Sequence, residues 1–166
     1  MTGRRYGWVR RPGAKVLREI AGLYRAAGWW EPGDTLGRIG RMVSGSHCFL
    51  VAREDGRTVA MGRAVSDRSN DAYIQDVFVL PAHRGRDIGA AVVRRLARRL
   101  RADGLGWVGL IAAEGTWPFY ARLGFRRMPR HEPMLLGGVL LSRRGRRPRS
   151  RRPWRAGVLL SRRGRR

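Results

Sequence analysis

A short basic turn between two regular elements is the part of the sequence best suited to hold a charged ligand. It follows an apolar, strand-like run and precedes an amphipathic segment that begins near Ile88. Gly85 permits a backbone conformation that other residues resist, and Gly89 lets a ligand approach the backbone. The unpaired N–H groups of a helix start favour anions, and Arg84 and Arg86 add charge that pairs with phosphate. The turn therefore predicts a phosphate site; the alternative is a corner that only joins a strand to a helix.

The histidines and the single cysteine are weaker candidates for chemistry. His47 opens a strand and His83 lies in the basic turn, and either could titrate near neutral pH. An isolated histidine is nevertheless more often a surface residue. Cys48 is the only cysteine, so an internal disulfide and the cysteine spacings of zinc sites are excluded. Its surroundings, HCFLVA, read as a core strand, and no histidine and asparagine spacing supports a thiol nucleophile.

One aspartate interrupts an otherwise apolar strand. Alternation over 71–80 predicts two sets on opposite faces: Ile74, Asp76 and Phe78, and Gln75, Val77 and Val79. A charged residue between two apolar ones on one face is unusual for a core strand. Asp76 is therefore a candidate proton acceptor, or equally a buried aspartate that holds an arginine or backbone amides.

Periodicity and turn residues predict the elements that position these residues. In chain order we expect a strand at 4–10, helices at 14–30 and 35–43, a hairpin at 47–67, a strand at 71–80, a helix at 88–103, a strand at 107–113, a short helix at 116–124, and one or two last strands at 125–135. The hairpin turns at Asp55-Gly56, a strong hairpin signal. This order predicts an α/β fold of the α+β kind, with one mixed sheet flanked by helices in a single layered domain.

The charge of the chain is extreme and uneven. The 166 residues carry a net charge of +24, and all 12 acidic residues lie before residue 136. Lys15 is the only lysine, and codon usage in a GC-rich genome explains this arginine bias without function. Attraction of cofactor phosphates, acidic substrates or nucleic acid is the functional alternative. No apolar run approaches the roughly 20 residues of a membrane span. No apolar segment follows the basic N-terminus as in a secretory signal, so a cytoplasmic location is expected.

The last thirty residues differ in character from the rest. The sequence GVLLSRRGRR occurs at 138–147 and again at 157–166. The segment is too charged and too poor in apolar residues to form a core. We therefore expect a domain over 1–136 and a basic, disordered tail over 137–166, with an arm for nucleic acid or a membrane surface as the alternative.

Two blocks of the sequence resemble the GNAT superfamily of acetyl-CoA-dependent N-acetyltransferases. The family's pyrophosphate loop, Gln/Arg-x-x-Gly-x-Gly/Ala, reads here as Arg84-Gly85-Arg86-Asp87-Ile88-Gly89, followed by Ala90. The later FYARLGF, residues 119–125, is similar to the family's aromatic pair, short helix and Gly-Phe. The resemblance covers residues 5–136. It implies a GNAT-like fold with a central, mostly antiparallel sheet.

The resemblance also implies an activity and a set of site residues. The activity is transfer of an acetyl group from acetyl-CoA to a primary amine of a small molecule or a protein. Tyr120 matches the tyrosine that protonates the departing thiolate, and Asp76 stands where relatives often place a carboxylate base. Residues implied in cofactor binding are the strand backbone at Phe78, Val79 and Leu80 and the loop residues Arg84, Gly85, Arg86, Asp87, Ile88, Gly89 and Ala90.

Two departures from the family pattern bear on cofactor binding. Asp87 replaces the first glycine of the loop, and its carboxylate would repel a pyrophosphate unless it points away or pairs with Arg84 or Arg86. Ala113 stands near the place of an asparagine that contacts the pantetheine arm in many relatives, so we expect that contact either to be missing or to be supplied by Thr116.

The acceptor and the partners stay open at this level. Trp29 and Trp30, with Glu31 and Asp34, are expected either to line an amine pocket or to form an aromatic plug between helix and sheet. Alternatives to an enzyme are a basic protein that associates with nucleic acid through its tail, and a CoA-binding sensor without turnover. The sequence does not decide between a monomer and a homodimer.

Overall fold

The computed structural model describes residues 3–134, so the expected basic tail over 137–166 lies outside the described residues. The elements in chain order are β1 (Arg5–Trp8), α1 (Ala14–Ala26), α2 (Leu36–Gly45), β2 (Cys48–Glu54), β3 (Arg57–Ser66), β4 (Asp71–Val79), the 3₁₀ helix η1 (Pro81–His83), α3 (Ile88–Ala102), β5 (Trp107–Leu110) and α4 (Trp117–Ala121). None of the helices in this part of the chain combines the length and apolar character that a bilayer crossing requires.

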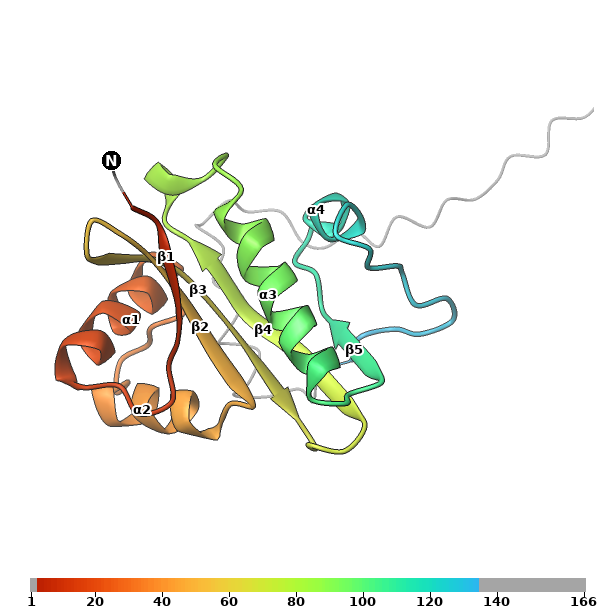
Figure 1. Ribbon diagram of the computed structural model, residues 1–166, viewed down its shortest axis with the longest axis horizontal. Coiled ribbons are helices and arrows are strands. Elements are labelled where there is room, and N and C mark those ends of the chain that lie inside the picture. The colour runs from red at the N-terminus through yellow and green to blue at the C-terminus, as the bar shows by residue number, and fades with distance from the viewer. Residues whose placement is uncertain (1–2, 135–166) are drawn as a thin grey trace, which may run out of the picture. The chain divides into compact units, whose positions relative to one another are not determined.

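The five strands form one mixed sheet in the order β1-β2-β3-β4-β5 (Figure 1). The first four pair antiparallel, and β4 pairs parallel with β5. The expected fold class, a mostly antiparallel mixed sheet flanked by helices, is confirmed. The parallel pairing is short: it runs from Asp71 opposite Trp107 to Ile74 opposite Leu110. Beyond Ile74 the two strands part, and β4 continues toward η1 paired with β3 (Figure 1).

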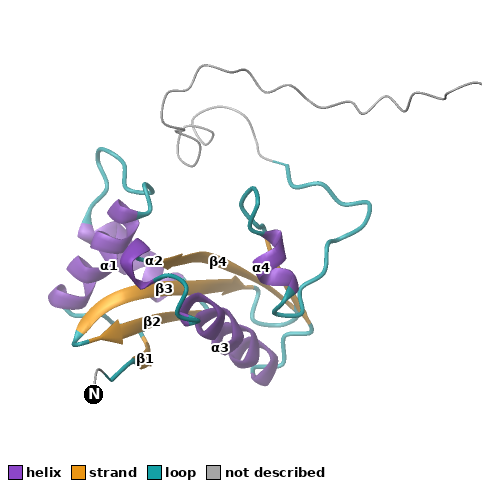
Figure 2. Cartoon of the chain, turned by 90° about the horizontal axis from the view of Figure 1, so that it is seen from above, coloured by secondary structure: helices purple, strands orange, loops and turns teal. Residues whose placement is uncertain are grey.

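Each face of the sheet has its own core (Figure 2). Helix α3 covers one face with an apolar stripe of Ile88, Val92, Val93, Leu96 and Leu100, all buried. Helices α1 and α2 cover the other face. The glycine at position 62 of β3 allows the close approach of α3, because a Cβ there would lie 2.7 Å from Val92 Cγ1. The sheet, including strand β4 with its candidate site residues, is thus packed against helices on both faces.

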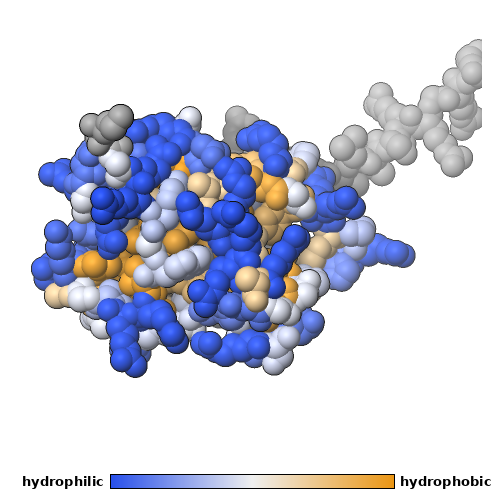
Figure 3. Space-filling model, in the orientation of Figure 1, coloured by the Kyte–Doolittle hydropathy of each residue, from blue (hydrophilic) through white to orange (hydrophobic). Residues whose placement is uncertain are grey.

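The outer face of α3 is basic, as the periodicity predicted. Its exposed arginines are Arg94, Arg95, Arg98, Arg99 and Arg101. Arg95 lies over the Tyr6 ring, with 4.4 Å from Cζ to the ring centroid, and ties the helix to β1. The face of the molecule that carries α3 is mostly hydrophilic in the space-filling view, with apolar areas between the charged side chains (Figure 3).

Strand β4 contains a bulge that changes which side chains share a face. Asp76 has φ of +52°, and between the pairs Gln75–Arg63 and Phe78–Met61 two residues of β4 lie opposite one residue of β3. Ile74 therefore packs in the α3 core with Val77, whereas Phe78 packs in the α1/α2 core. The prediction that Ile74 shares a face with Asp76 and Phe78 is wrong, because the extra residue shifts the alternation by one.

Two predicted elements end differently in the structure. The first helix stops at Ala26 rather than at residue 30, because Gly28 takes φ of +72° and Trp29 N–H closes onto Tyr24 O at 2.9 Å. The expected strands after Phe125 are wrong for the part that is described, since residues 126–134 form no strand. Prolines at 129 and 133 each remove a backbone donor that a ladder needs.

Candidate functional site

A groove of about 910 Å³ opens where β4 and β5 part. One wall is the end of β4, and the opposite wall is formed by Gly115, Thr116 and residues of α4 and its C-terminal end. The loop between η1 and α3 and the first turn of α3 close its upper end. The groove therefore collects, from four segments, most of the residues that the sequence singled out.

The loop before α3 presents backbone amides to this groove. Gly85 has φ of +73° and Asp87 has φ of +61°, so the chain turns twice through the left-handed region before the helix begins. The first bond that closes a helical turn runs from Ala91 N to Asp87 O at 3.0 Å. The amides of residues 88–90 therefore have no acceptor within the helix, and these residues line the groove. Such an end of a helix binds anions.

The two arginines of the loop point in different directions. Arg84 lines the groove, where its Nε donates to Val79 O at 3.1 Å and its guanidinium lies 5.7 Å from the centroid of the Phe78 ring. Arg86 does not line it: its Nη1 donates to Glu54 Oε2 at 3.0 Å. The expectation that both arginines face a phosphate is therefore met by the placement of Arg84 and not by that of Arg86.

The carboxylate of Asp87 is neutralised by an arginine that the sequence analysis missed. It forms an ion pair with Arg94 of α3, not with Arg84 or Arg86 as expected. Arg94 also lines the groove, as does Arg122 just after α4. Arg94 follows Asp87 by seven residues, two helical turns, so the spacing along the helix could have revealed the pair. Together these side chains give the groove a basic upper end.

Tyr120 lies on α4 and borders the same groove. Its ring is half-buried between Phe119 and Phe125, with centroid distances of 4.9 Å and 6.1 Å. Burial raises the pKa of its phenol above the ordinary value, so the hydroxyl is protonated at neutral pH. A protonated phenol in a groove with an anion-binding end can donate a proton to a bound group.

Comparison with known proteins identifies the family of this chain. A sequence model of the Acetyltransferase (GNAT) family matches residues 16–125. This chain belongs to the GNAT acetyltransferase family. Within the family it is similar to the histone acetyltransferase TAP1 of Glycine max, 31% identical over 123 residues, which cover 74% of this chain and 48% of that protein. The chain thus spans about half the length of this relative.

Two further relatives bear on the donor and the fold. The glucosamine 6-phosphate N-acetyltransferase of Trypanosoma brucei brucei is 39% identical over 110 residues, which cover 66% of this chain and 68% of that protein. The solved aminoglycoside N-acetyltransferase AAC(6')-Iy in complex with CoA shares the fold, with a TM-score of 0.67, 14% identity, and coverage of 84% of this chain and 97% of that one. Acetyl-CoA as the donor of this GNAT domain is consistent with the family.

The groove of this GNAT domain has a basic end, at the loop before α3, and also borders Tyr120. The loop amides and Arg84, Arg94 and Arg122 suit the phosphate groups of acetyl-CoA, and the end of β4 suits its extended arm. Val79 borders the groove, whereas both backbone groups of Leu80 are already bonded, its N–H to Val59 O at 2.9 Å and its carbonyl to His83 N at 2.9 Å. Of the expected strand partners, Leu80 therefore has no N–H to offer, and its carbonyl keeps one acceptor position.

Thr116 lies where the sequence analysis placed a substitute for the family's asparagine. It lines the groove, and its hydroxyl donates to Ala113 O at 2.7 Å. Its oxygen can accept a hydrogen bond from a ligand, but the hydroxyl hydrogen is already in use. Thr116 thus matches the missing asparagine in place but only in part in hydrogen-bonding capacity.

Asp76 lies on the α1 side of the sheet and is not among the residues that line the groove. Its Oδ2 accepts hydrogen bonds from Arg63 Nε at 2.6 Å and from the Tyr24 hydroxyl at 2.8 Å. Burial, with the Asp76 charge as the next cause, raises the pKa of Tyr24. Of the two readings of this aspartate, the arrangement matches the carboxylate that holds an arginine.

The tryptophans after α1 pack between helix and sheet. The Trp29 ring lies 5.9 Å from that of Tyr24 and 5.8 Å from that of Phe78, both centroid distances with edge contacts. Arg25 covers the Trp30 ring at 4.0 Å from its centroid, and Asp34 forms an ion pair with Arg38. This placement matches the aromatic plug. Since Phe78 also borders the groove, its ring lies between Trp29 and the site.

The remaining candidates have structural partners. Cys48 is buried, and burial raises the pKa of its thiol to about 11, so it is not a nucleophile at neutral pH. His47 contacts Ser66 and Asp103 at the far end of α3. His83 borders the groove, and its Nδ1 lies 2.7 Å from Glu54 Oε2. Of these three candidates, His83 borders the groove, and Cys48 and His47 do not.

Proposed function

We propose that this chain transfers an acetyl group from acetyl-CoA to an amine by direct attack, with Tyr120 as the general acid. The observation that carries the proposal is that one groove joins the amides and arginines at the start of α3 to the phenol of Tyr120. An anion site fixes the donor, and the phenol supplies the proton that the departing sulfur needs.

Acetyl-CoA supplies the activated carbonyl, and the protein supplies position and the proton. As the new bond between nitrogen and carbonyl carbon forms, the bond between that carbon and sulfur breaks. The Tyr120 hydroxyl then protonates the thiolate, and the amine loses its own proton to water. We give Asp76 no direct part in this step, because its Oδ2 accepts hydrogen bonds from Arg63 and Tyr24. In the proposal, Asp76 helps to hold strand β4 in place through these two hydrogen bonds.

The acceptor is proposed at the level of a class, a primary amine. The related proteins named above act, by their names, on histones and on glucosamine 6-phosphate. A panel of a lysine peptide, an amino sugar phosphate and simple alkylamines therefore covers both kinds of acceptor. Release of free CoA thiol in the presence of an amine, together with acetylated product, tests the reaction.

Substitution of Tyr120 tests the assignment of the acid. Tyr120→Phe keeps the ring packing and removes the hydroxyl, so kcat should fall about 100-fold while the Kd for CoA stays the same. Phe119→Leu is a control that alters packing next to Tyr120 and keeps the phenol. An unchanged kcat in Tyr120→Phe would reject the acid role. If the wild-type protein binds CoA but releases no thiol with any amine, a sensor without turnover is the better description.

A further inference from the structure

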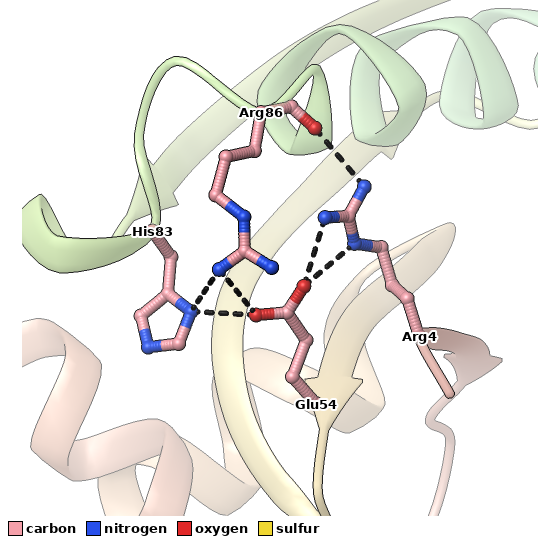
Figure 4. Close-up of polar contacts among 4 residues, drawn as sticks. All are labelled: Arg4, Glu54, His83 and Arg86. Carbon is pink, nitrogen blue, oxygen red and sulfur yellow. Dashed lines mark hydrogen bonds and ion pairs between the residues drawn. The ribbon is translucent and has the colours of Figure 1, made fainter. Parts of the chain in front are cut away.

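One buried carboxylate ties together three segments around the phosphate loop. Glu54 is the last residue of β2, and only 7% of its side chain is exposed. Its Oε1 accepts from Arg4 Nε at 2.9 Å, and its Oε2 meets His83 Nδ1 at 2.7 Å and Arg86 Nη1 at 3.0 Å (Figure 4). Hydrogen bonding, first from His83 and then from Arg4, lowers the pKa of the Glu54 carboxyl. The carboxylate is therefore ionised at neutral pH.

Arg4 makes a second contact that reaches the backbone of the loop. Its Nη1 donates to the carbonyl oxygen of Arg86 at 3.0 Å (Figure 4). The peptide between residues 86 and 87 is planar and trans, so its carbonyl and its N–H point in opposite directions. By holding the carbonyl, Arg4 turns the N–H of Asp87 away from itself. Asp87 borders the groove and Arg86 does not, so the residue that carries this N–H lies on the ligand side of the loop.

The loop needs such support because of the residue at position 87. Asp87 has φ of +61°, which glycine adopts freely and other residues adopt only at an energetic cost. Two contacts hold it there: Arg94 binds its carboxylate, and Arg4 binds the carbonyl before it. Glu54 in turn holds the Arg4 guanidinium and withdraws that of Arg86 from the groove.

We propose that Glu54 and Arg4 are positioning residues for the diphosphate of the donor: through the carbonyl of Arg86 they aim the loop amide at Asp87 into the groove. This inference rests on the proposed function, since it concerns how the same groove holds acetyl-CoA. Neither side chain touches the donor. Their effect is confined to the phosphate end, because the Arg4–Glu54 contacts involve η1 and the loop and not α4.

Comparison of two donors separates this role from a general effect on folding. S-acetylpantetheine carries the thioester and the extended arm but lacks the diphosphate. In Glu54→Gln, the Kd for CoA and the KM for acetyl-CoA should rise about tenfold with kcat unchanged, which corresponds to the loss of one charge-assisted hydrogen bond. The kcat/KM for S-acetylpantetheine should stay within twofold of wild type. A merely structural loss would lower activity with both donors.

A second pair of variants keeps the test valid if Glu54→Gln does not fold. Arg4 is partly exposed, so Arg4→Met should fold and weaken CoA about tenfold, while Arg4→Lys, which retains a donor and the charge, should recover part of the affinity. Asp103→Asn is the matched control: it neutralises another carboxylate held by a histidine and an arginine, far from the groove, and should leave CoA affinity unchanged.

The outcomes are distinguishable from failure of the proposed function. If wild-type protein binds no CoA and transfers no acetyl group, the proposed function fails. If wild type is active and Glu54→Gln and Arg4→Met bind CoA as tightly as wild type, or lose activity equally with both donors, the positioning role is wrong. An effect on acetyl-CoA alone, with partial recovery in Arg4→Lys, supports it.

Discussion

The two ends of helix α3 carry similar side chains and are finished in opposite ways. At the C-terminal end, Asp103 accepts from Arg99 Nε at 2.6 Å and meets His47 Nε2 at 2.8 Å, while the N–H of Leu105 closes onto Leu100 O at 3.1 Å. At the N-terminal end, Asp87 pairs with Arg94, but the amides of residues 88–90 face the groove. The C-terminal end of α3 is thus capped by groups of the chain itself. At the N-terminal end, backbone donors of the first turn remain for a ligand.

An aspartate paired with an arginine occurs at both ends of α3, and we expect it to serve stability at one end and ligand binding at the other. An acid at a helix C-terminus is opposed by the helix dipole, so Asp103 depends on its two cationic partners. Asp87, at the N-terminus, suits the dipole but competes with an anionic ligand, so Arg94 has to compensate its charge. If this comparison is right, substitutions at the two ends should separate cleanly between CoA affinity and free energy of unfolding.

The largest expected effect comes from filling the open end. A Cβ at Gly89 would lie 3.4 Å from Val79 Cγ2 and 3.6 Å from Phe119 Cζ, ordinary contacts for one methyl group. Gly89→Ala should therefore bind CoA within a few-fold of wild type. The two further methyl groups of Gly89→Val project into the space between α3 and α4, and calorimetry should show CoA affinity at least 100-fold weaker. Equal affinities of the two variants would place the donor elsewhere.

Loss of the arginine at the open end should have the next largest effect. Arg94→Ala removes a groove cation and leaves Asp87 uncompensated, so CoA should bind about tenfold more weakly at low salt, with a smaller loss at high salt. Arg98→Ala is the matched control, because Arg98 is exposed on the same helix and does not line this groove. Similar losses in both variants would indicate a general effect of net charge.

The closed end should affect stability alone. Hydrogen bonds from Arg99, then from His47, lower the pKa of Asp103. Because the folded pKa lies below the unfolded value of about 4, its contribution is present above that pH and is lost as pH falls through the folded pKa. Asp103→Asn should lower the free energy of unfolding by about 1 kcal/mol at pH 7. In urea titrations the difference from wild type should shrink below pH 4; a constant difference would contradict the assignment.

The smallest expected effect is a gain. Asp87→Gly restores a residue that adopts the left-handed conformation freely and removes the carboxylate next to the diphosphate. Calorimetry should show CoA affinity about threefold higher, a small change because Arg94 already neutralises the carboxylate. Weaker binding by Asp87→Gly would mean that the aspartate helps to order the loop.

The site was predictable where the signal was local. The turn before α3, the buried stripe of that helix and the aromatic pair of α4 follow from spacings within a few residues. The structure places the turn and the aromatic pair at the groove and the stripe against the sheet. Arg94 could have been found in the same way, from its spacing to Asp87. The family resemblance, which the comparison with a GNAT sequence model confirms, added the order of the two blocks.

What the sequence could not give depends on contacts between distant segments. Arg86 binds Glu54, a residue 32 positions away, and no local pattern indicates that it leaves the groove. The bulge at Asp76 depends on the register of β4 against β3, so strict alternation misassigned Ile74. Leu80 was expected to pair with the donor, but its N–H already donates to Val59 O of β3 and its carbonyl accepts from His83 N of η1.

The bulge at Asp76 has a consequence for mutational scans of this protein. Substitutions along β4 should show sensitivity that alternates with one phase up to Ile74 and with the opposite phase from Val77 onward. A deletion of one residue at position 75 or 76 should remove the bulge and restore a single phase, with Val77 and Val79 still on the α3 side of the sheet and Phe78 on the α1 side. A point that tolerates the deletion of one residue is thus expected in the middle of a strand rather than in a loop.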